Sequence, residues 1–285
     1  YITIPNLMKK ILYHILALLI IFMLILIYGR FFGVNGLKTN EYIIKSNSID
    51  EYYNGLKIIH FSDLHYKKVI TEKKVKDLIK EINKQKPDIV IFTGDLLDKD
   101  YKLNTDDISF LIKELSKIET TYGCYSIIGD NDYLKEDEIK NIYLQSNFTL
   151  LDNDYSIIKN PNNKSIIISG ISSYTYDEAD TTKIDEYLNN NNNDSYKIIL
   201  MHEPDYIEKL NYNYDLALAG HSLNGSVNIP FIKKLFLEDN AKDYYKPYYK
   251  VNNTDFYISN GIGVSNINFR VFNTPSINIY RILKG

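Results

Sequence analysis

The chain has 285 residues, of which 45% are hydrophobic and 24% charged, the balance of an ordinary folded protein. Its formal net charge of −3 gives no electrostatic basis for nucleic-acid binding, which calls for a basic patch, so no nucleic-acid partner is expected. Cys124 is the only cysteine, which excludes an intrachain disulfide and leaves stability to core packing.

The segment 11–28 is almost entirely apolar and is interrupted only by His14. A helix of about 17–20 such residues crosses a bilayer, so we predict one transmembrane anchor here, after a tail of residues 1–10. A cleaved signal peptide would need a small-residue cleavage site behind the apolar stretch, and Arg30 with two phenylalanines stands there instead. A buried core helix is disfavoured because no polar stripe runs along the segment.

Charges around the anchor predict its orientation. Lys9 and Lys10 precede the apolar stretch, and two more basic residues follow it. By the positive-inside rule we expect a cytoplasmic N-terminus, a single pass through the cell membrane and an extracytoplasmic main domain. Met8 looks like a natural start, so we interpret residues 1–7 as upstream sequence or the end of a fragment.

Residues 29–55 are predicted to form a linker with a first edge strand near Tyr42–Lys45. Strands and amphipathic helices then alternate in the order Leu56–Phe61, Thr71–Lys86, Asp88–Thr93, Asp106–Glu119, Tyr125–Ile128 and Glu136–Gln145. This alternation favours βαβ units whose sheets are covered on both faces.

The second half of the chain has a different rhythm. It is predicted to contain a hairpin (Tyr155–Ile158 and Ile166–Gly170), an exposed asparagine-rich loop (189–193), a short helix (Asp205–Leu210) and four more strands (Ile198–Met201, Leu216–Ala219, Phe256–Ser259 and Ser276–Ile282). The whole of 56–285 is therefore predicted to be one α/β domain, a sandwich of two mixed β-sheets flanked by helices.

Five of the predicted strands run into an aspartate or a histidine. These residues are Asp63 and His65 after the first strand, then Asp95, Asp130, His202 and His221 after the other four. Ligands bind at the carboxyl ends of strands in α/β sheets, and aspartate with histidine suits divalent metals such as Mn, Fe or Zn. Each motif alone is a weak signal, but five in order point to a metal site.

The chain resembles the calcineurin-like metallophosphoesterase superfamily, and in particular its membrane-anchored bacterial branch. The resemblance rests on Asp63-Leu64-His65, Gly94-Asp95-Leu96-Leu97-Asp98, Gly129-Asp130-Asn131-Asp132, Met201-His202-Glu203-Pro204 and Gly220-His221-Ser222-Leu223, and it covers roughly residues 55 to 282. It implies the family's two-sheet sandwich and the hydrolysis of a phosphomonoester or phosphodiester.

The resemblance also implies two divalent metal ions (Mn, Fe or Zn) that generate a hydroxide nucleophile. Asp95 would bridge the ions and take part in catalysis. Asp63 and His65 would hold the first metal, and Asp130, His202 and His221 the second. Because the anchor lies at a bilayer, a lipid-linked or cell-envelope phosphoester is the expected substrate.

Three positions depart from the family pattern. Asp130 replaces the usual asparagine and still offers a hard ligand. Leu223 replaces a histidine that completes the first metal's ligands, so weaker binding is expected there. Asn131 replaces the catalytic histidine and cannot supply a proton, although it could hydrogen-bond a phosphate oxygen. Two interpretations stay open: a hydrolase with reduced activity, or a catalytically weakened metal-binding domain that acts as a membrane-tethered binder or scaffold.

Four further features are expected to be structural. Asp98 and Asp132 should orient loops around the metals rather than touch them. Arg270 is expected to form a surface ion pair, and Tyr244–Tyr249 an ordinary amphipathic loop.

Overall fold

The structure is a computed structural model that describes residues 6–191, 195–229, 233–265 and 267–285. Its α-helices are α1 (Asn6–Ile27), α2 (Glu72–Lys84), α3 (Thr105–Leu115), α4 (Glu136–Gln145) and α5 (Thr182–Asn190). Shorter helical turns are η1 (Tyr28–Phe32), η2 (Glu51–Tyr53), η3 (Tyr133–Lys135), η4 (Pro204–Lys209) and η5 (Lys233–Phe236). The strands are β1 (Lys38–Ser46), β2 (Leu56–Phe61), β3 (Ile89–Phe92), β4 (Cys124–Ser126), β5 (Phe148–Leu150), β6 (Asp154–Lys159), β7 (Ser165–Gly170), β8 (Tyr196–Met201), β9 (Leu216–Ala219), β10 (Tyr248–Val251), β11 (Thr254–Ile258) and β12 (Ser276–Lys284).

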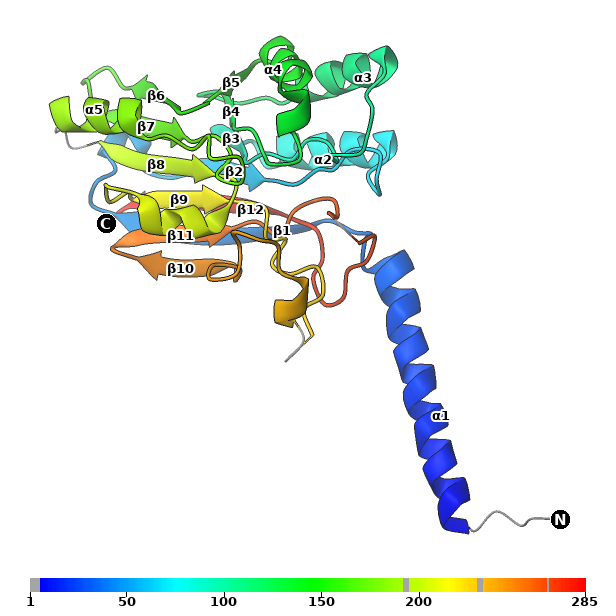
Figure 1. The fold of residues 1–285 in the computed structure, drawn as a ribbon. Coiled ribbons are helices and arrows are strands. Elements are labelled where there is room, and N and C mark those ends of the chain that lie inside the picture. Colours follow the sequence, from blue (N-terminus) through cyan, green and yellow to red (C-terminus); the bar gives the residue numbers. More distant parts are fainter. Residues whose placement is uncertain (1–5, 192–194, 230–232, 266) are drawn as a thin grey trace.

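The N-terminal helix stands away from the rest of the chain (Figure 1). α1 continues into the π-helical turn η1, and together they are long and apolar enough to cross a membrane. The helix already begins at Asn6, so residues 6–10 are helical rather than part of the predicted tail. Lysine and leucine are good helix formers and extend the helix beyond its apolar stretch. Residues 1–5 of that tail lie outside the described residues.

Two six-stranded mixed sheets account for the strands in the described residues. The first has the order β1-β12-β2-β3-β4-β5, with β2 to β5 parallel and β12 antiparallel to β2. The second has the order β10-β11-β9-β8-β7-β6, with β11, β9, β8 and β7 parallel and the two outer strands antiparallel. This confirms the predicted two-sheet fold.

Three apolar clusters divide the fold into layers (Figure 1). Between the sheets, side chains such as Ile58 and Ile91 meet Ile168 and Ile198 from the opposite sheet. Alternate residues of β2 and β3 point the other way and pack against α2, α3 and α4, because successive side chains of a strand face opposite sides. A third cluster joins the outer face of the second sheet to α5 and η4. Helices thus flank both sheets.

The asparagine-rich segment is the main error in the predicted elements. Asn189 and Asn190 end helix α5 instead of forming a loop, while residues 192–193 lie outside the described residues. Ile184 and Leu188, one turn apart, are both buried beneath the helix, and such packing overrides the weak helix propensity of asparagine. The predicted loop Tyr244–Tyr249 likewise runs into strand β10 at a sheet edge.

Candidate active site

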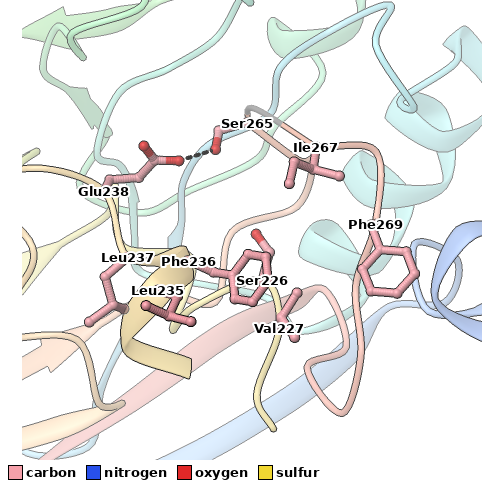
Figure 2. A pocket seen from close by; sticks show the side chains of 9 residues that line it. All are labelled: Ser226, Val227, Leu235, Phe236, Leu237, Glu238, Ser265, Ile267 and Phe269. Atoms are coloured by element: carbon pink, nitrogen blue, oxygen red, sulfur yellow. Dashed lines mark hydrogen bonds between the residues drawn. The ribbon is translucent and has the colours of Figure 1, made fainter. Parts of the chain in front are cut away.

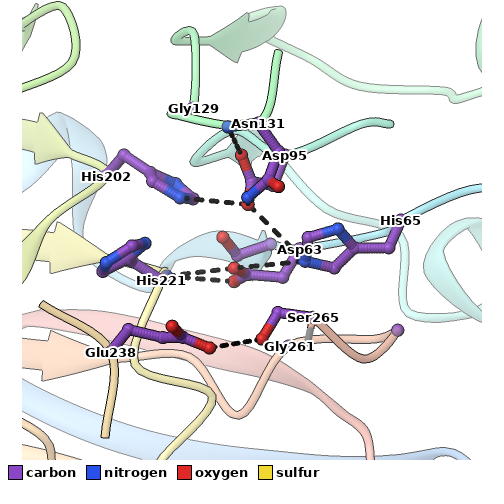
Figure 3. Close-up of polar contacts among 12 residues, drawn as sticks. Asp63, His65, Asp95, Gly129, Asn131, His202, His221, Glu238, Gly261 and Ser265 are labelled. Atoms are coloured by element: carbon purple, nitrogen blue, oxygen red, sulfur yellow. Dashed lines mark hydrogen bonds and ion pairs between the residues drawn. The ribbon is translucent and has the colours of Figure 1, made fainter. Parts of the chain in front are cut away.

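The residues predicted for the first metal meet at the ends of two neighbouring parallel strands. Asp63 and His65 follow β2, and Asp95 follows β3. One ligand atom of each lies within 4.8 Å of the others, with His65 Nε2 at 3.5 Å from Asp95 Oδ2 and 4.0 Å from Asp63 Oδ1. All three side chains are buried. The structure therefore brings this predicted group together (Figure 3).

A second group draws on both sheets. Asp130 lies beyond β4, whereas His202 and His221 follow β8 and β9 of the other sheet. Their ligand atoms also lie within 4.8 Å of one another. Asp130 Oδ1 is 3.1 Å from His202 Nε2 and 3.0 Å from His221 Nδ1. The carboxyl ends of the two sheets thus converge on one site.

Backbone carbonyls orient both imidazoles of this second group. His202 Nδ1 lies 2.6 Å from the carbonyl oxygen of Thr93, and His221 Nε2 lies 2.7 Å from that of Asp239. Each ring therefore donates one N–H to the backbone and turns its other nitrogen toward Asp130, the usual arrangement of metal-binding histidines. Asp239 could not be found from the sequence, because any residue type supplies a carbonyl.

The site is built on unusual backbone. Asp63, His65, Asp95 and His221 all have left-handed φ angles, between 44° and 61°. Such conformations cost of order 1–3 kcal/mol each in non-glycine residues and cluster at functional sites. The loops also approach closely, since a Cβ atom on Gly129 would lie 2.2 Å from Asp95 Oδ1. Gly129 is therefore required because the neighbouring loops approach too closely for a side chain.

Asp95 connects the two groups. Its Oδ2 lies 3.5 Å from His65 Nε2 in the first group and 3.4 Å from His202 Nε2 in the second. Asn131 fixes this carboxylate, because its backbone N–H donates to Oδ1 at 2.9 Å and its side-chain amide donates to Oδ2 at 2.6 Å. Asp95 thus has the position expected of a carboxylate that faces two cations (Figure 3).

The donor set fits divalent cations. Both nitrogens of His65 and Nε2 of His202 are buried without a hydrogen-bond partner, although buried polar atoms are normally paired. Burial raises the pKa of Asp95 to about 8 and lowers that of His65 to about 4. Burial also opposes charge on His221, but the Asp130 carboxylate raises the His221 pKa to about 9. Asp95 and His221 hence hold protons at neutral pH that metal binding would release, whereas His65 is already neutral, the form in which an imidazole binds a metal.

A family model described as "Calcineurin-like phosphoesterase" matches residues 56–225, more than half of the chain. The chain belongs to the calcineurin-like phosphoesterase family. It is 27% identical over 261 residues to the uncharacterized metallophosphoesterase YkuE of Bacillus subtilis (strain 168), covering 90% of this chain and 88% of that protein. It is 28% identical over 273 residues to the uncharacterized metallophosphoesterase YkoQ of the same strain, covering 90% and 97%. The phosphodiesterase YaeI of Escherichia coli (strain K12) is 23% identical over 213 residues, covering 73% and 75%. This phosphoesterase is accordingly a metal-dependent phosphoester hydrolase.

A small cavity opens over the phosphoesterase site. It has a volume of about 80 Å³ and is lined by Asp95, Lys99, Asp130, Asn131, His221, Glu238 and Ser265. At about 30 Å³ per water molecule, it holds two or three waters or one small polar group. Sequence reasoning missed Lys99, Glu238 and Ser265. The last two belong to loops far from the motifs, so nothing in the chain order indicated them.

Three further carboxylates of the sequence motifs, outside the two groups, hold the surrounding loops. Asp132 accepts hydrogen bonds from the backbone N–H groups of Leu96 and Leu97, at 3.1 and 3.0 Å. Glu203 accepts from the Ser173 hydroxyl at 2.6 Å. Asp98 lies 2.5 Å from the Lys68 ammonium and 3.9 Å from His65 Nδ1. They position the loops that carry Asp95, His202 and His65.

The predicted surface ion pair of Arg270 is wrong. The side chain is completely buried, and its Nε and Nη2 donate to the carbonyl oxygen of Gly263 at 3.0 and 2.5 Å. Arg270 and Gly263 both belong to the segment between β11 and β12, so these hydrogen bonds join two parts of one loop. Arg270 therefore stabilises this loop beside the site. Although burial lowers the pKa of its guanidinium, the negative charge of Asp63 favours the charged form and acts to raise that pKa.

Proposed function

We propose that this protein hydrolyses a phosphomonoester or phosphodiester that is lipid-linked or part of the cell envelope, using two divalent ions (Mn, Fe or Zn) held with unequal strength. The position of Asp95 carries the proposal. One carboxylate oxygen lies within 3.5 Å of an imidazole nitrogen in each of the two ligand groups. Two metal positions that share a carboxylate suit the clamping of one phosphoryl group.

Each residue then has a defined role. Asp63 and His65 would hold the first ion, Asp130, His202 and His221 the second, and Asp95 both. Ions bound there would polarise the phosphoryl oxygens and activate a water molecule. The first position is short of a ligand because buried Leu223 offers only carbon. Three protein ligands are still a workable open site.

Asn131 supports the reaction without transferring a proton. Its amide orients Asp95 and also lines the cavity, where it can donate a hydrogen bond to a phosphoryl oxygen. Lys99 adds a positive charge to the same cavity. General acid–base help is worth about 10²–10⁴-fold, so its loss favours esters whose leaving group departs without protonation.

The N-terminal helix supports a location at a membrane. α1 and η1 form a span of sufficient length and apolar character, and the chain returns directly from it into β1 of the catalytic domain. An anchor of this kind would hold the site close to a bilayer, which supports a membrane-borne substrate, while Lys9 and Lys10 before the apolar stretch support an extracytoplasmic domain.

The test is metal-dependent turnover by the full chain in detergent. With Mn²⁺ and bis(4-nitrophenyl) phosphate, we expect release of nitrophenolate that EDTA abolishes. Asp95→Asn should lower the rate to the EDTA background, because one oxygen shared by both ions is lost. Asp255→Asn is the matched control, since Asp255 binds Tyr248 near the start of β11, at the opposite end of the sheet.

Two outcomes contradict the proposal. Turnover that Asp95→Asn leaves unchanged would place the chemistry elsewhere. Two bound ions without turnover would favour the second candidate function, a membrane-tethered binder or scaffold. That candidate is motivated by Asn131 and Leu223, which stand where the family has histidines.

A further inference from the structure

An apolar pocket lies beside the polar cavity (Figure 2). It has a volume of about 160 Å³, and its apolar walls are Val227, Leu235, Phe236, Leu237, Ile267 and Phe269. These residues come from two loops, one after β9 and one between β11 and β12. A cavity of about 150 Å³ with apolar walls binds a benzene-sized molecule. The pocket therefore has room for one short stretch of hydrocarbon.

The pocket and the polar cavity share a wall. Glu238 and Ser265 line both of them. The Ser265 hydroxyl donates a hydrogen bond to Glu238 Oε1 at 2.5 Å, which holds the two loops together at this point (Figures 2 and 3). On one side of this pair lie Asp95, Asp130 and His221, and on the other side lie only apolar walls and Ser226. A ligand spanning both compartments would be amphiphilic.

The same pocket is fastened to the end of the membrane helix. The backbone N–H of Arg270 donates to the carbonyl oxygen of Gly29 at 3.0 Å. A Cβ on Gly29 would lie 2.4 Å from the ring of Phe269, and one on Gly33 would lie 1.8 Å from the Arg270 carbonyl oxygen. Only glycine permits this approach of the helix to the pocket wall. The pocket is thus placed where the helix leaves the membrane.

Exposed apolar side chains are present both at the pocket and on the turn that ends the helix. Leu235 is 80% exposed and Ile267 54% exposed at the pocket itself, and Phe31 and Phe32 are exposed on η1. In Figure 1, the gold turn η5 lies on the side of the sheets from which α1 departs. Large exposed apolar residues are typical of interaction surfaces. Because this pocket contacts the end of a helix that could span a membrane, lipid is the apolar partner expected there.

We propose that this pocket is a subsite for the hydrocarbon tail of a membrane-resident phosphoester, whose phosphate occupies the neighbouring metal cavity. The inference rests on the proposed hydrolysis and assigns its substrate class, an amphiphile with the phosphate close to its chain. The first few methylenes pass the Glu238–Ser265 pair into the pocket, and the remaining chain stays in the bilayer. The subsite therefore selects for a tail rather than for a particular headgroup.

Binding of matched alkyl phosphates tests this without any need for turnover. The full chain in phosphatidylcholine nanodiscs, loaded with Mn²⁺, is titrated with methyl phosphate and with hexyl phosphate. Each buried methylene is worth about fourfold in affinity, so we expect hexyl phosphate to bind at least tenfold more tightly. Leu235→Asp should remove most of that preference while methyl phosphate binds as before.

Leu144→Asp is the matched control, because Leu144 is 77% exposed on α4, away from the pocket, and it should change neither affinity. Equal binding of the two phosphates, no binding of either, or equal effects of the two variants would overturn the subsite. Hydrolysis of 4-nitrophenyl methyl phosphate is measured in parallel. Turnover without a tail preference contradicts only the subsite, and a tail preference without turnover contradicts only the proposed hydrolysis.

Discussion

In the proposed two-metal site, the side chain of Leu223 is the reason for expecting unequal binding of the two ions. It is 1% exposed, with a left-handed φ of 49°. Its Cδ2 and the Cβ of Asp63 lie 2.3 and 3.1 Å from the point where a Cβ on Gly261 would sit. Residue 223 thus borders Asp63, and an apolar side chain there withholds a ligand from the first group.

Leu223→His should therefore strengthen the first position. An added imidazole beside Asp63, His65 and Asp95 is expected to tighten the weaker of two Mn²⁺ binding steps at least tenfold, since even groups behind the ligands are worth about 10–100-fold. Calorimetric titration of the metal-free full chain measures both steps. Leu223→Met keeps the apolar character as a control, and identical titrations of the two variants would contradict the assignment.

The sequence predicts which residues form the site better than it predicts what surrounds each side chain. Asp63, His65, Asp95, Asp130, His202 and His221 could be found because each follows a buried strand, and strand ends meet at one edge. The burial of Arg270 could not be predicted, because it depends on tertiary packing around the segment between β11 and β12. Lys99 and Asp239 reach the site through tertiary contacts that leave no periodic signal.

Strands β2, β3 and β12 are joined through a buried histidine in addition to their backbone ladder. His60 on β2 lies 2.8 Å from the Thr93 hydroxyl beyond β3 and 3.3 Å from the Tyr280 hydroxyl on β12. Complete burial lowers the His60 pKa to about 3 from its usual 6.5. The imidazole therefore stays neutral in the folded protein at pH values where it is charged in the unfolded chain.

This difference makes stability fall in acid. Between pH 6.5 and 3 the unfolded chain binds a proton that the native state does not, so the free energy of unfolding falls by up to about 1.4 kcal/mol per pH unit. Above pH 6.5 neither state is protonated and the effect vanishes. Urea unfolding of the EDTA-treated protein should show wild type losing about 1 kcal/mol more than His60→Gln between pH 6 and 5. Equal losses of unfolding free energy in the wild type and in His60→Gln would show that His60 does not cause the effect.

The bounds of an element could be predicted where it forms an uninterrupted apolar or amphipathic run. β2, β9 and α4 have the predicted bounds, because each is a continuous apolar or amphipathic run. Strand β5 has three residues and β10 lies at a sheet edge, so neither shows a clear alternation. Helix α5 was hidden because its polar face is rich in asparagine.

The assembled molecule couples one helix to one catalytic domain at a fixed junction. The sequence predicts an anchor at 11–28, a linker with an edge strand at 29–55 and a domain at 56–285. In the structure, few residues of that linker are free of contacts with the domain. Gly29 and Gly33 already contact loop 262–273, and β1 begins at Lys38 beside β12. The domain is thus held against the end of helix α1 rather than tethered to it at a distance.

That arrangement makes the predicted orientation measurable with single cysteines. Cys124, the only native cysteine, is buried, and burial raises its thiol pKa to about 11, so it should resist maleimides. Asn162→Cys places a thiol on the exposed turn between β6 and β7, and Lys9→Cys places one at the other end of α1. With an extracytoplasmic domain, a membrane-impermeant maleimide should label position 162 in intact spheroplasts and position 9 only after lysis. The reverse pattern would place the catalytic domain in the cytoplasm, where the lipid-tail subsite would draw its substrate from the inner leaflet.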